Sequence, residues 1–190
     1  MASIIKANEL QDFGGNSIIT SDGAGTITLS SGMNTAVAAG TNNTPAFEAS
    51  LSANQTVSDS ADVKVQFNTE TFDTDNCYDN STNYRFTPTT AGKYFVYVRI
   101  QCDSNAANNL QQGFAKIYKN GSRAAQAQMN MNGNFPENIM VECSNIIDMN
   151  GSSDYLEGYV NIDDTSGDGN VRGTTSYVWT CFGAYKIIGA

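Results

Sequence analysis

The sequence predicts an all-β protein, a sandwich or barrel of short strands joined by many turns. The 190 residues include 17 Gly and are rich in Asn, Ser and Thr, which favour turns. Apolar and polar side chains alternate in many short runs, and no segment keeps a helical period. With 40% hydrophobic residues, including nine Tyr and nine Phe, the chain can fill a core. Short strands at this spacing are typical of sandwiches and barrels.

Residues 1–44 are predicted to form an N-terminal anchor segment and linker. Two short strands, Ser17–Thr20 and Thr26–Ser30, flank a Gly-rich turn, and the Ala/Gly/Asn/Thr-rich stretch 32–44 is typical of a linker. Because an isolated hairpin is marginal in water, this segment must pack on something larger. Its expected apolar contacts are Ile4, Ile5, Leu10, Phe13, Ile18, Ile19, Ile27 and Leu29.

Residues 45–190 are predicted to form one jelly-roll-like domain. In the strand 93–102 both faces are apolar, which predicts a central strand buried on two sides. The predicted strands are Ala46–Ser52, Val63–Phe72, Tyr84–Thr87, Lys93–Cys102, Gly113–Tyr118, Ala124–Asn130, Ile139–Asp148, Tyr155–Ile162 and Tyr177–Ile188.

Two Asn-Gly pairs predict tight turns within this domain. Asn120-Gly121 and Asn150-Gly151 each stand between strand-like runs, and Asn-Gly favours the positive φ values of a two-residue hairpin. The polar segments 103–110, 130–136 and 163–174 are predicted to be the outward loops, where binding modules carry specificity.

The charge of the chain argues against several classes of partner. A net charge of −9 with only ten basic residues disfavours nucleic acid and anionic membranes. No apolar run approaches the roughly 20 residues of a membrane helix. The start MASIIKANELQDF lacks the features of a signal peptide, so we expect a protein that is not secreted by that route.

The four cysteines are expected to be buried free thiols. Cys102, Cys143 and Cys181 lie in apolar runs, and Cys77 follows an Asp/Asn-rich stretch. Two disulfides remain an alternative, with three connectivities. The lack of CxxC pairs and of histidine argues against zinc.

The absence of histidine also argues against an enzyme. It rules out Ser–His–Asp and Cys–His arrangements within one chain. Carboxylate pairs such as Asp73 with Asp75, or Asp163 with Asp164, could act on glycosidic bonds. Both pairs lie in segments with loop-like composition, where solvent-exposed acids are normal, so we expect no catalytic residues and no cofactor.

One segment is similar to the start of a calcium-binding loop. Asp164, Ser166 and Asp168 place oxygens at positions one, three and five, and Gly169 stands at position six. Position twelve is Thr175 instead of a bidentate Glu, and the flanks are strand-like. The segment is therefore interpreted as a polar turn, with calcium as the alternative.

The aromatic residues allow two interpretations. At alternating strand positions they predict core or subunit contacts, while the alternative is a sugar-binding surface. The residues assigned to core or subunit contacts are Phe67, Tyr94, Phe95, Tyr97, Tyr159, Trp179, Phe182 and Tyr185.

Several fragments in order resemble the C1q globular-head family, in the wider C1q/TNF jelly-roll group. They are Ala46-Phe47, Val63–Phe67, Tyr78-Asp79, Phe86-Thr87-Pro88, Gly92-Lys93-Tyr94-Phe95, Ile117–Gly121, Asp154–Val160 and Phe182-Gly183-Ala184-Tyr185. The resemblance covers about residues 45–188. It implies a ten-stranded jelly roll that forms homotrimers. The family's collagen stalk is absent, and the segment GGNSIITSDGAGTITLSSG stands in its place.

This opening before a C1q-like head resembles virion proteins of tailed bacteriophages. The resemblance implies a non-enzymatic structural protein of the virion, assembled in the host cytoplasm. It would be a trimeric fibre or adhesin tip, or an outer decoration on capsid or tail. Its partners would be its own copies, other virion proteins and a host surface glycan or protein. The alternative is a carbohydrate-binding, lectin-like module, with or without calcium.

Overall fold

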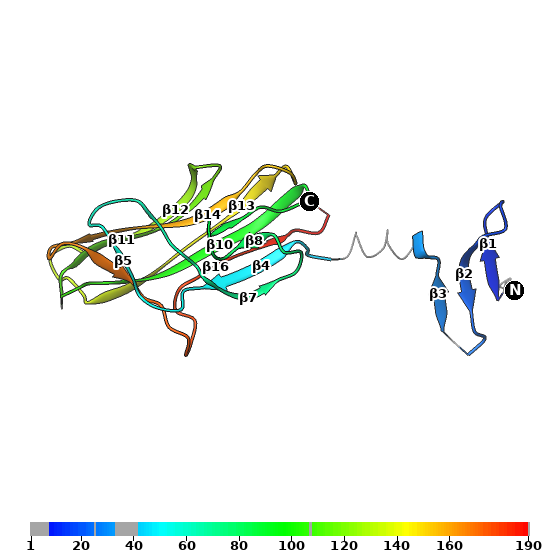
Figure 1. The fold of residues 1–190 in the computed structure, drawn as a ribbon, viewed down its shortest axis with the longest axis horizontal. Helices are drawn as coiled ribbons and strands as arrows, with labels where there is room; N and C mark the ends of the chain where they lie inside the picture. The colour runs from blue at the N-terminus through cyan, green and yellow to red at the C-terminus, as the bar shows by residue number, and fades with distance from the viewer. Residues whose placement is uncertain (1–7, 25, 33–41, 107, 190) are drawn as a thin grey trace, which may run out of the picture. The chain divides into compact units, whose positions relative to one another are not determined.

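The structure, a computed structural model, describes residues 8–24, 26–32, 42–106 and 108–189. These residues are almost entirely strands, turns and loops. They fall into two compact units, one up to residue 42 and one covering residues 43–188, here called the sandwich domain (Figure 1). The expected anchor residues Ile4 and Ile5, and most of the expected linker 32–44, lie outside the described residues.

The N-terminal unit is an antiparallel sheet with the strand order β1-β2-β3. Its strands are β1 (Glu9–Gln11), β2 (Ser17–Ser21) and β3 (Ile27–Leu29). The sequence predicted β2 and β3 but not β1. Ile19 of β2 pairs with Leu10 of β1 and with Leu29 of β3. Since opposite residues share a face, these three side chains form an apolar row across the sheet.

Within residues 43–106 and 108–188 the first sheet of the sandwich has seven strands, and β10 (Gly92–Asp103) lies at its centre. β13 (Asn138–Met149) pairs with one side of β10 over twelve residues. On its other side β10 pairs first with β16 (Cys181–Lys186) and then with β15 (Gly169–Val171). The remaining strands are β4 (Ala46–Ser50), β7 (Thr69–Asp73) and β5 (Gln55–Val57).

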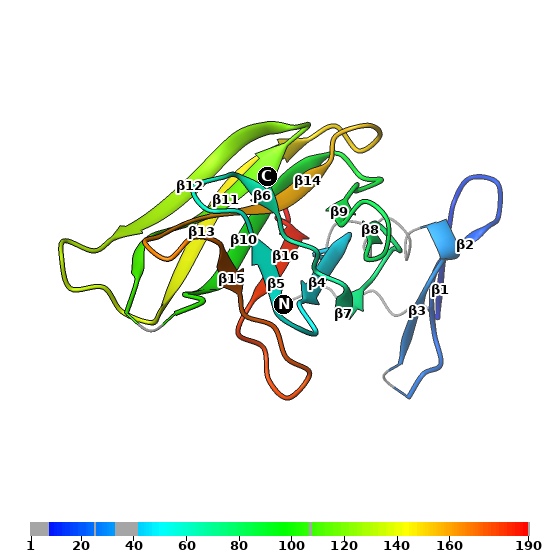
Figure 2. The same ribbon diagram turned by 60° about the vertical axis from the view of Figure 1, so that its left-hand side comes forward.

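The second sheet has the order β12-β11-β14-β9-β8, and β6 also pairs with β14. Its strands are β12 (Ser122–Asn130), β11 (Leu110–Lys119), β14 (Leu156–Asp164), β9 (Arg85–Phe86), β8 (Tyr78–Asp79) and β6 (Val63–Lys64). The two sheets are the layers of the sandwich (Figures 1 and 2).

The core lies between the sheets and has an aromatic centre. The ring of Phe47 stacks on Tyr78 and on Phe86, both at 4.5 Å between centroids, and meets Phe182 edge-on at 5.0 Å. Along β10 the side chains of Tyr94, Val96, Val98, Ile100 and Cys102 are fully buried. These residues alternate with half-buried ones, as a strand with a single buried face requires.

The prediction of one strand over residues 63–72 was wrong, because the structure divides it into β6 and β7. Val65 and Phe67 are buried, so the alternation of apolar and polar residues correctly predicted which side chains are buried but not which residues pair in a sheet. After β6 the side-chain amide of Gln55 forms hydrogen bonds with the backbone in place of a neighbouring strand. It donates to the carbonyl of Lys64 at 2.9 Å and accepts from the N–H of Gln66 at 2.9 Å.

The last predicted strand was too long, because β16 begins at Cys181 and not at Tyr177. Arg99 binds the preceding carbonyls through its guanidinium group. Its Nε donates to Trp179 at 3.1 Å and its Nη2 to Val178 at 2.8 Å. Residues 173–180 therefore form a loop, which extends beyond the sheets in both views (Figures 1 and 2).

One of the two Asn-Gly turns is a hairpin, as predicted. Asn120 and Gly121 have φ values of 52° and 76° and join β11 to β12. The second prediction was wrong: β13 pairs with β10 and β14 with β11, so residues 150–155 connect the two sheets. Asn150 organises that connection by accepting the N–H groups of Ser152, Ser153 and Asp154.

The strand ends define two ends of the sandwich domain. Ala46, Gly92 and Lys186 lie at the end where the chain enters the domain. Asp103, Asn138, Leu110 and Asp164 lie at the opposite end. Of the predicted outward loops, the described parts of 103–110 and 130–136 lie at this far end. The prediction of a loop over 163–174 was partly wrong, because β14 runs to Asp164 and β15 occupies Gly169–Val171.

Candidate functional site

The first sheet presents an aromatic surface to its outer side, here called the outer aromatic face: Phe72, Phe95, Tyr97, Ile146 and Tyr185. On β10, Phe95 pairs with Ile146 on one side and Tyr185 on the other. The ring of Phe95 lies 5.5 Å from Tyr185 and 6.2 Å from Tyr97. Ile146 is 56% exposed and Tyr185 is 39% exposed, so no element among the described residues of the sandwich domain covers this part of the face.

Tyr97 is held at the middle of the outer aromatic face. Its ring lies over Gly183, where an added Cβ would come within 2.4 Å of the ring. Its hydroxyl donates to Glu48 Oε2 at 2.6 Å. Burial, together with this hydrogen bond, raises the pKa of Tyr97 well above that of free tyrosine. The tyrosine therefore stays a neutral donor, and Glu48 is anchored beside it.

The structure places the aromatic residues expected in core or subunit contacts at four sites. Phe67, Tyr94 and Phe182 are fully buried in the core. Phe95, Tyr97 and Tyr185 belong to the outer aromatic face. Tyr159 lies on the outer side of the second sheet and stacks on Tyr118 at 4.1 Å. Trp179 lies in the loop before β16, 4.9 Å from the guanidinium of Arg172.

The prediction that residues 93–102 are buried on both sides was wrong for the single chain. One side of β10 is fully buried, while Phe95, Tyr97, Arg99 and Gln101 on the other side are only half-buried. The apolar pattern on that side is explained if another chain covers it.

The outer side of the second sheet carries a satisfied polar network. Glu157 is buried, and its Oε1 accepts from Lys64 at 3.0 Å and from Arg85 at 2.8 Å. Burial opposes ionisation of Asp62, but hydrogen bonds from Lys116, Tyr118 and Asn161 outweigh it and lower its pKa. Each charge here has a partner, so the network is interpreted as structural.

The structure does not bring Asp164, Ser166 and Asp168, the residues of the alternative calcium interpretation, into one site. The carboxylate of Asp164 accepts from the N–H and hydroxyl of Ser166, whereas that of Asp168 accepts from the N–H of Asp59. Among the described residues no group of three or more His, Cys, Asp or Glu side chains is arranged for a metal ion. Asp73 likewise accepts from the N–H of Tyr78, as turn-capping acids do.

The four cysteines are free and buried in this structure. Burial raises the pKa of Cys102 to about 12 and that of Cys181 to about 11. Thiols with such pKa values are poor nucleophiles at neutral pH.

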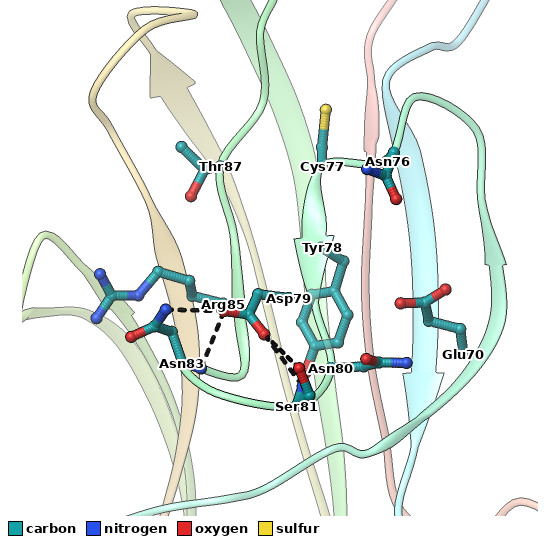
Figure 3. A pocket seen from close by; sticks show the side chains of 10 residues that line it. All are labelled: Glu70, Asn76, Cys77, Tyr78, Asp79, Asn80, Ser81, Asn83, Arg85 and Thr87. Carbon is teal, nitrogen blue, oxygen red and sulfur yellow. Dashed lines mark hydrogen bonds between the residues drawn. The ribbon is translucent and has the colours of Figure 1, made fainter.

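A polar pocket lies between β7 and the turn that joins β8 to β9, here called the β7–β9 pocket (Figure 3). Its volume is about 460 Å³. The sequence did not predict this pocket, although Asn76 ends the acidic stretch 73–76 that was a weak candidate for a metal site. Tyr78 and Asp79 belong to one of the fragments that resemble the C1q family. It is lined by Glu70, Asn76, Cys77, Tyr78, Asp79, Asn80, Ser81, Asn83, Arg85 and Thr87.

The frame of the β7–β9 pocket is rigid. Asp79 accepts the backbone N–H groups of Ser81, Thr82 and Asn83 at 2.9–3.1 Å, and the side-chain amide of Asn83 at 2.7 Å. These bonds lower the pKa of Asp79 far below that of free aspartate. The ring of Tyr78 stacks on Phe47 in the core, and its hydroxyl donates to the carbonyl of Phe67 at 2.9 Å.

The N-terminal unit exposes most of the expected anchor residues. Phe13, Ile27 and Leu10 are exposed, while Ile18, Ile19 and Leu29 are half-buried. A shallow hollow of about 280 Å³ is lined by Leu10, Ile19 and Ile27 together with Asn8, Glu9 and Ser21. The row Leu10–Ile19–Leu29 thus borders a surface that no described residue of the unit covers.

No protein-family model matches the chain, and no curated protein matches it. Among solved structures, Eiger TNF from S. frugiperda matches with a TM-score of 0.52 and 13% sequence identity. The match covers 76% of this chain and 93% of that chain. The sandwich domain is a TNF-like jelly roll. At this identity the likeness shows the fold and nothing about ligands or partners. Within the described residues no helix is long and apolar enough to cross a membrane.

Proposed function

We propose that the protein is a non-enzymatic structural protein of a tailed-phage virion, with a homotrimeric C1q-like head. It would be a fibre or adhesin tip, or an outer decoration on capsid or tail. The observation that carries the proposal is a pair of apolar surfaces in two separate units. The outer aromatic face lies on the sandwich domain, and the row Leu10–Ile19–Leu29 lies on the N-terminal unit.

The outer aromatic face suits an interface between copies of the chain. Exposed contiguous apolar patches on soluble proteins mark interaction sites, and aromatic residues are enriched in the cores of interfaces. Glu48 and Arg99 are held beside this face by hydrogen bonds. Their charged groups would fix how two copies align in the contact. Three copies meeting through this face would cover the side of β10 that the single chain leaves half-buried.

The N-terminal unit suits an attachment device. Leu10 and Ile27 of this small sheet are 55% and 65% exposed, so packing on a larger body would bury apolar surface that the sheet leaves open. Residues 1–44 carry one basic residue, Lys6, against the acids Glu9, Asp12 and Asp22. The attachment site on the particle would therefore be apolar, with basic groups at its rim.

Recognition at the outside of the particle would fall to the head. The chain has no histidine, and the carboxylates of Asp73, Asp164 and Asp168 accept backbone N–H groups. These features support binding over catalysis. A carbohydrate-binding role, the second candidate, is favoured by the β7–β9 pocket.

Light scattering of the purified protein, with and without residues 1–31, tests the proposal. The full chain is expected at about 61 kDa, three times the 20.3 kDa chain, and the truncated protein at three times its own shorter chain. The truncated trimer should fail to join virions during assembly. A monomeric full-length protein would contradict the trimer, and a truncated protein that still incorporates would contradict the anchor.

A further inference from the structure

We infer that the β7–β9 pocket is a binding site for a neutral saccharide residue. The inference deepens the proposed recognition role of the head, and it does not depend on where the protein attaches to a particle. Its argument rests on the size of the pocket, its unengaged polar groups, its charge and its place in the fold.

The pocket has the size and stiffness of a small-ligand site. Its volume of about 460 Å³ falls within the range of roughly 300–1,000 Å³ that is common for such sites. Asp79 closes the turn 79–83 with three backbone bonds, and Tyr78 fixes the floor to the core. A pre-formed site loses little conformational entropy when a ligand binds.

Four polar side chains line the pocket without a hydrogen-bond partner among the described residues: Glu70, Asn76, Asn80 and Thr87. Figure 3 shows Glu70, Asn76 and Asn80 around the ring of Tyr78. The carboxylate only accepts hydrogen bonds, the hydroxyl and the amides both donate and accept, and so the set matches a ligand with several hydroxyl groups. A hexose or an N-acetylhexosamine is such a ligand.

The charges at the pocket disfavour an acidic sugar. Glu70 and Asp79 supply two negative charges. The cation among the lining residues, Arg85, is bound to Glu157 at 2.8 Å and lies 4.0 Å above the ring of Tyr155. Figure 3 shows its guanidinium pointing away from Tyr78. A carboxylate or sulfate on the ligand would therefore meet repulsion without a free partner.

The register of β7 leaves the pocket open in the proposed trimer. Phe72 pairs with Glu48 and belongs to the outer aromatic face, whereas Glu70 pairs with the buried Ala49. Residues two apart in a regular strand lie on the same side, but the pairing of β4 with β7 shifts by one residue between Glu48 and Ala49. Phe72 and Glu70 are therefore on different sides of β7. A second copy that covers Phe72 leaves Glu70 and the turn 79–83 accessible.

Saturation-transfer NMR and calorimetry with free methyl glycosides test the inference on the full-length protein. The panel holds neutral hexosides, deoxyhexosides and N-acetylhexosaminides, with glucuronide and sialoside as acidic members. At least one neutral glycoside should bind with a Kd on the order of 1 mM, about −4 kcal/mol. The acidic members should bind more weakly than their neutral counterparts.

Two substitutions in the pocket and two matched controls locate the site. Asn80→Ala and Glu70→Gln should each raise the Kd about tenfold and leave the thermal unfolding temperature unchanged, because neither side chain makes a hydrogen bond within the described chain. Asn132→Ala and Glu137→Gln change exposed residues of the same types at the far end of the domain and should change neither quantity. A panel without binding, or binding that both pocket variants retain, would overturn the inference. Light scattering on the same samples reports the trimer separately, so the two proposals fail independently.

Discussion

At the scale of single residues, carboxylates hold the loops of this protein together. Asp73, Asp79 and Asp164 each accept backbone N–H groups of the turn that follows them. These carboxylates of the acidic chain therefore stabilise turns. Binding has to come from residues that these turns leave free, such as Asn80 beside Asp79.

The turn at Asp79 gives a prediction about pH. The pKa of Asp79 is lowered in the folded state, so ionisation of this group stabilises the fold above the unfolded pKa of about 4, and that contribution is lost as pH falls through the lower folded value. Asp79→Asn keeps one acceptor oxygen and loses the bonds made by the other, which should lower the free energy of unfolding by about 1 kcal/mol at pH 7.

Urea unfolding at several pH values measures this difference. The gap between wild type and Asp79→Asn should be constant from pH 7 to about pH 5 and should narrow below about pH 4, as the wild-type carboxylate takes up its proton. Asp163→Asn, a change near the end of β14 at the far end of the domain, serves as the control. A gap that stays constant down to pH 2 would show that the carboxylate charge contributes nothing here.

At the scale of strands and turns, the sequence predicts burial better than pairing. Alternation correctly placed Val65 and Phe67 in the core, but the hydrogen bonds that interrupt this stretch come from Gln55, ten residues earlier. The end of the last strand depends in the same way on Arg99, about eighty residues away. Such distant side-chain bonds leave no local pattern, and neither does the β7–β9 pocket, whose residues come from three short strands and the turns between them.

The hairpin at Asn120-Gly121 is an element that the sequence does specify. Gly121 has a φ of 76°, and a side chain there is strained. Gly121→Ala should therefore cost about 1 kcal/mol of stability. Ser122→Ala, in the same turn at an exposed site, should stay within about 0.5 kcal/mol of wild type. Chemical denaturation of the three proteins compares them, and equal stabilities of Gly121→Ala and wild type would contradict the role of the turn.

At the scale of the whole molecule, the two units share one feature: each exposes an apolar surface. In the sandwich domain the outer aromatic face lies on the outer side of β10, and the inner side of β10 is fully buried in the core. A second copy packed against the outer aromatic face would bury β10 on both sides. In the N-terminal unit no described residue covers the apolar row. The two surfaces therefore need different partners, which is the physical content of the proposed division into head and anchor.

A charge placed on the outer aromatic face tests the trimer without disturbing the monomer. Ile146 is 56% exposed in the single chain, so Ile146→Glu should hardly change the stability of an isolated sandwich domain. In the trimer the same carboxylate would be desolvated without a partner, which costs several kcal/mol for each copy. The mass measured by light scattering should then fall from about 61 kDa to the 20.3 kDa of the monomer. Gln126→Glu adds the same charge to the outer side of the opposite sheet and should remain trimeric. If Ile146→Glu keeps the wild-type trimer mass, the copies meet through another surface.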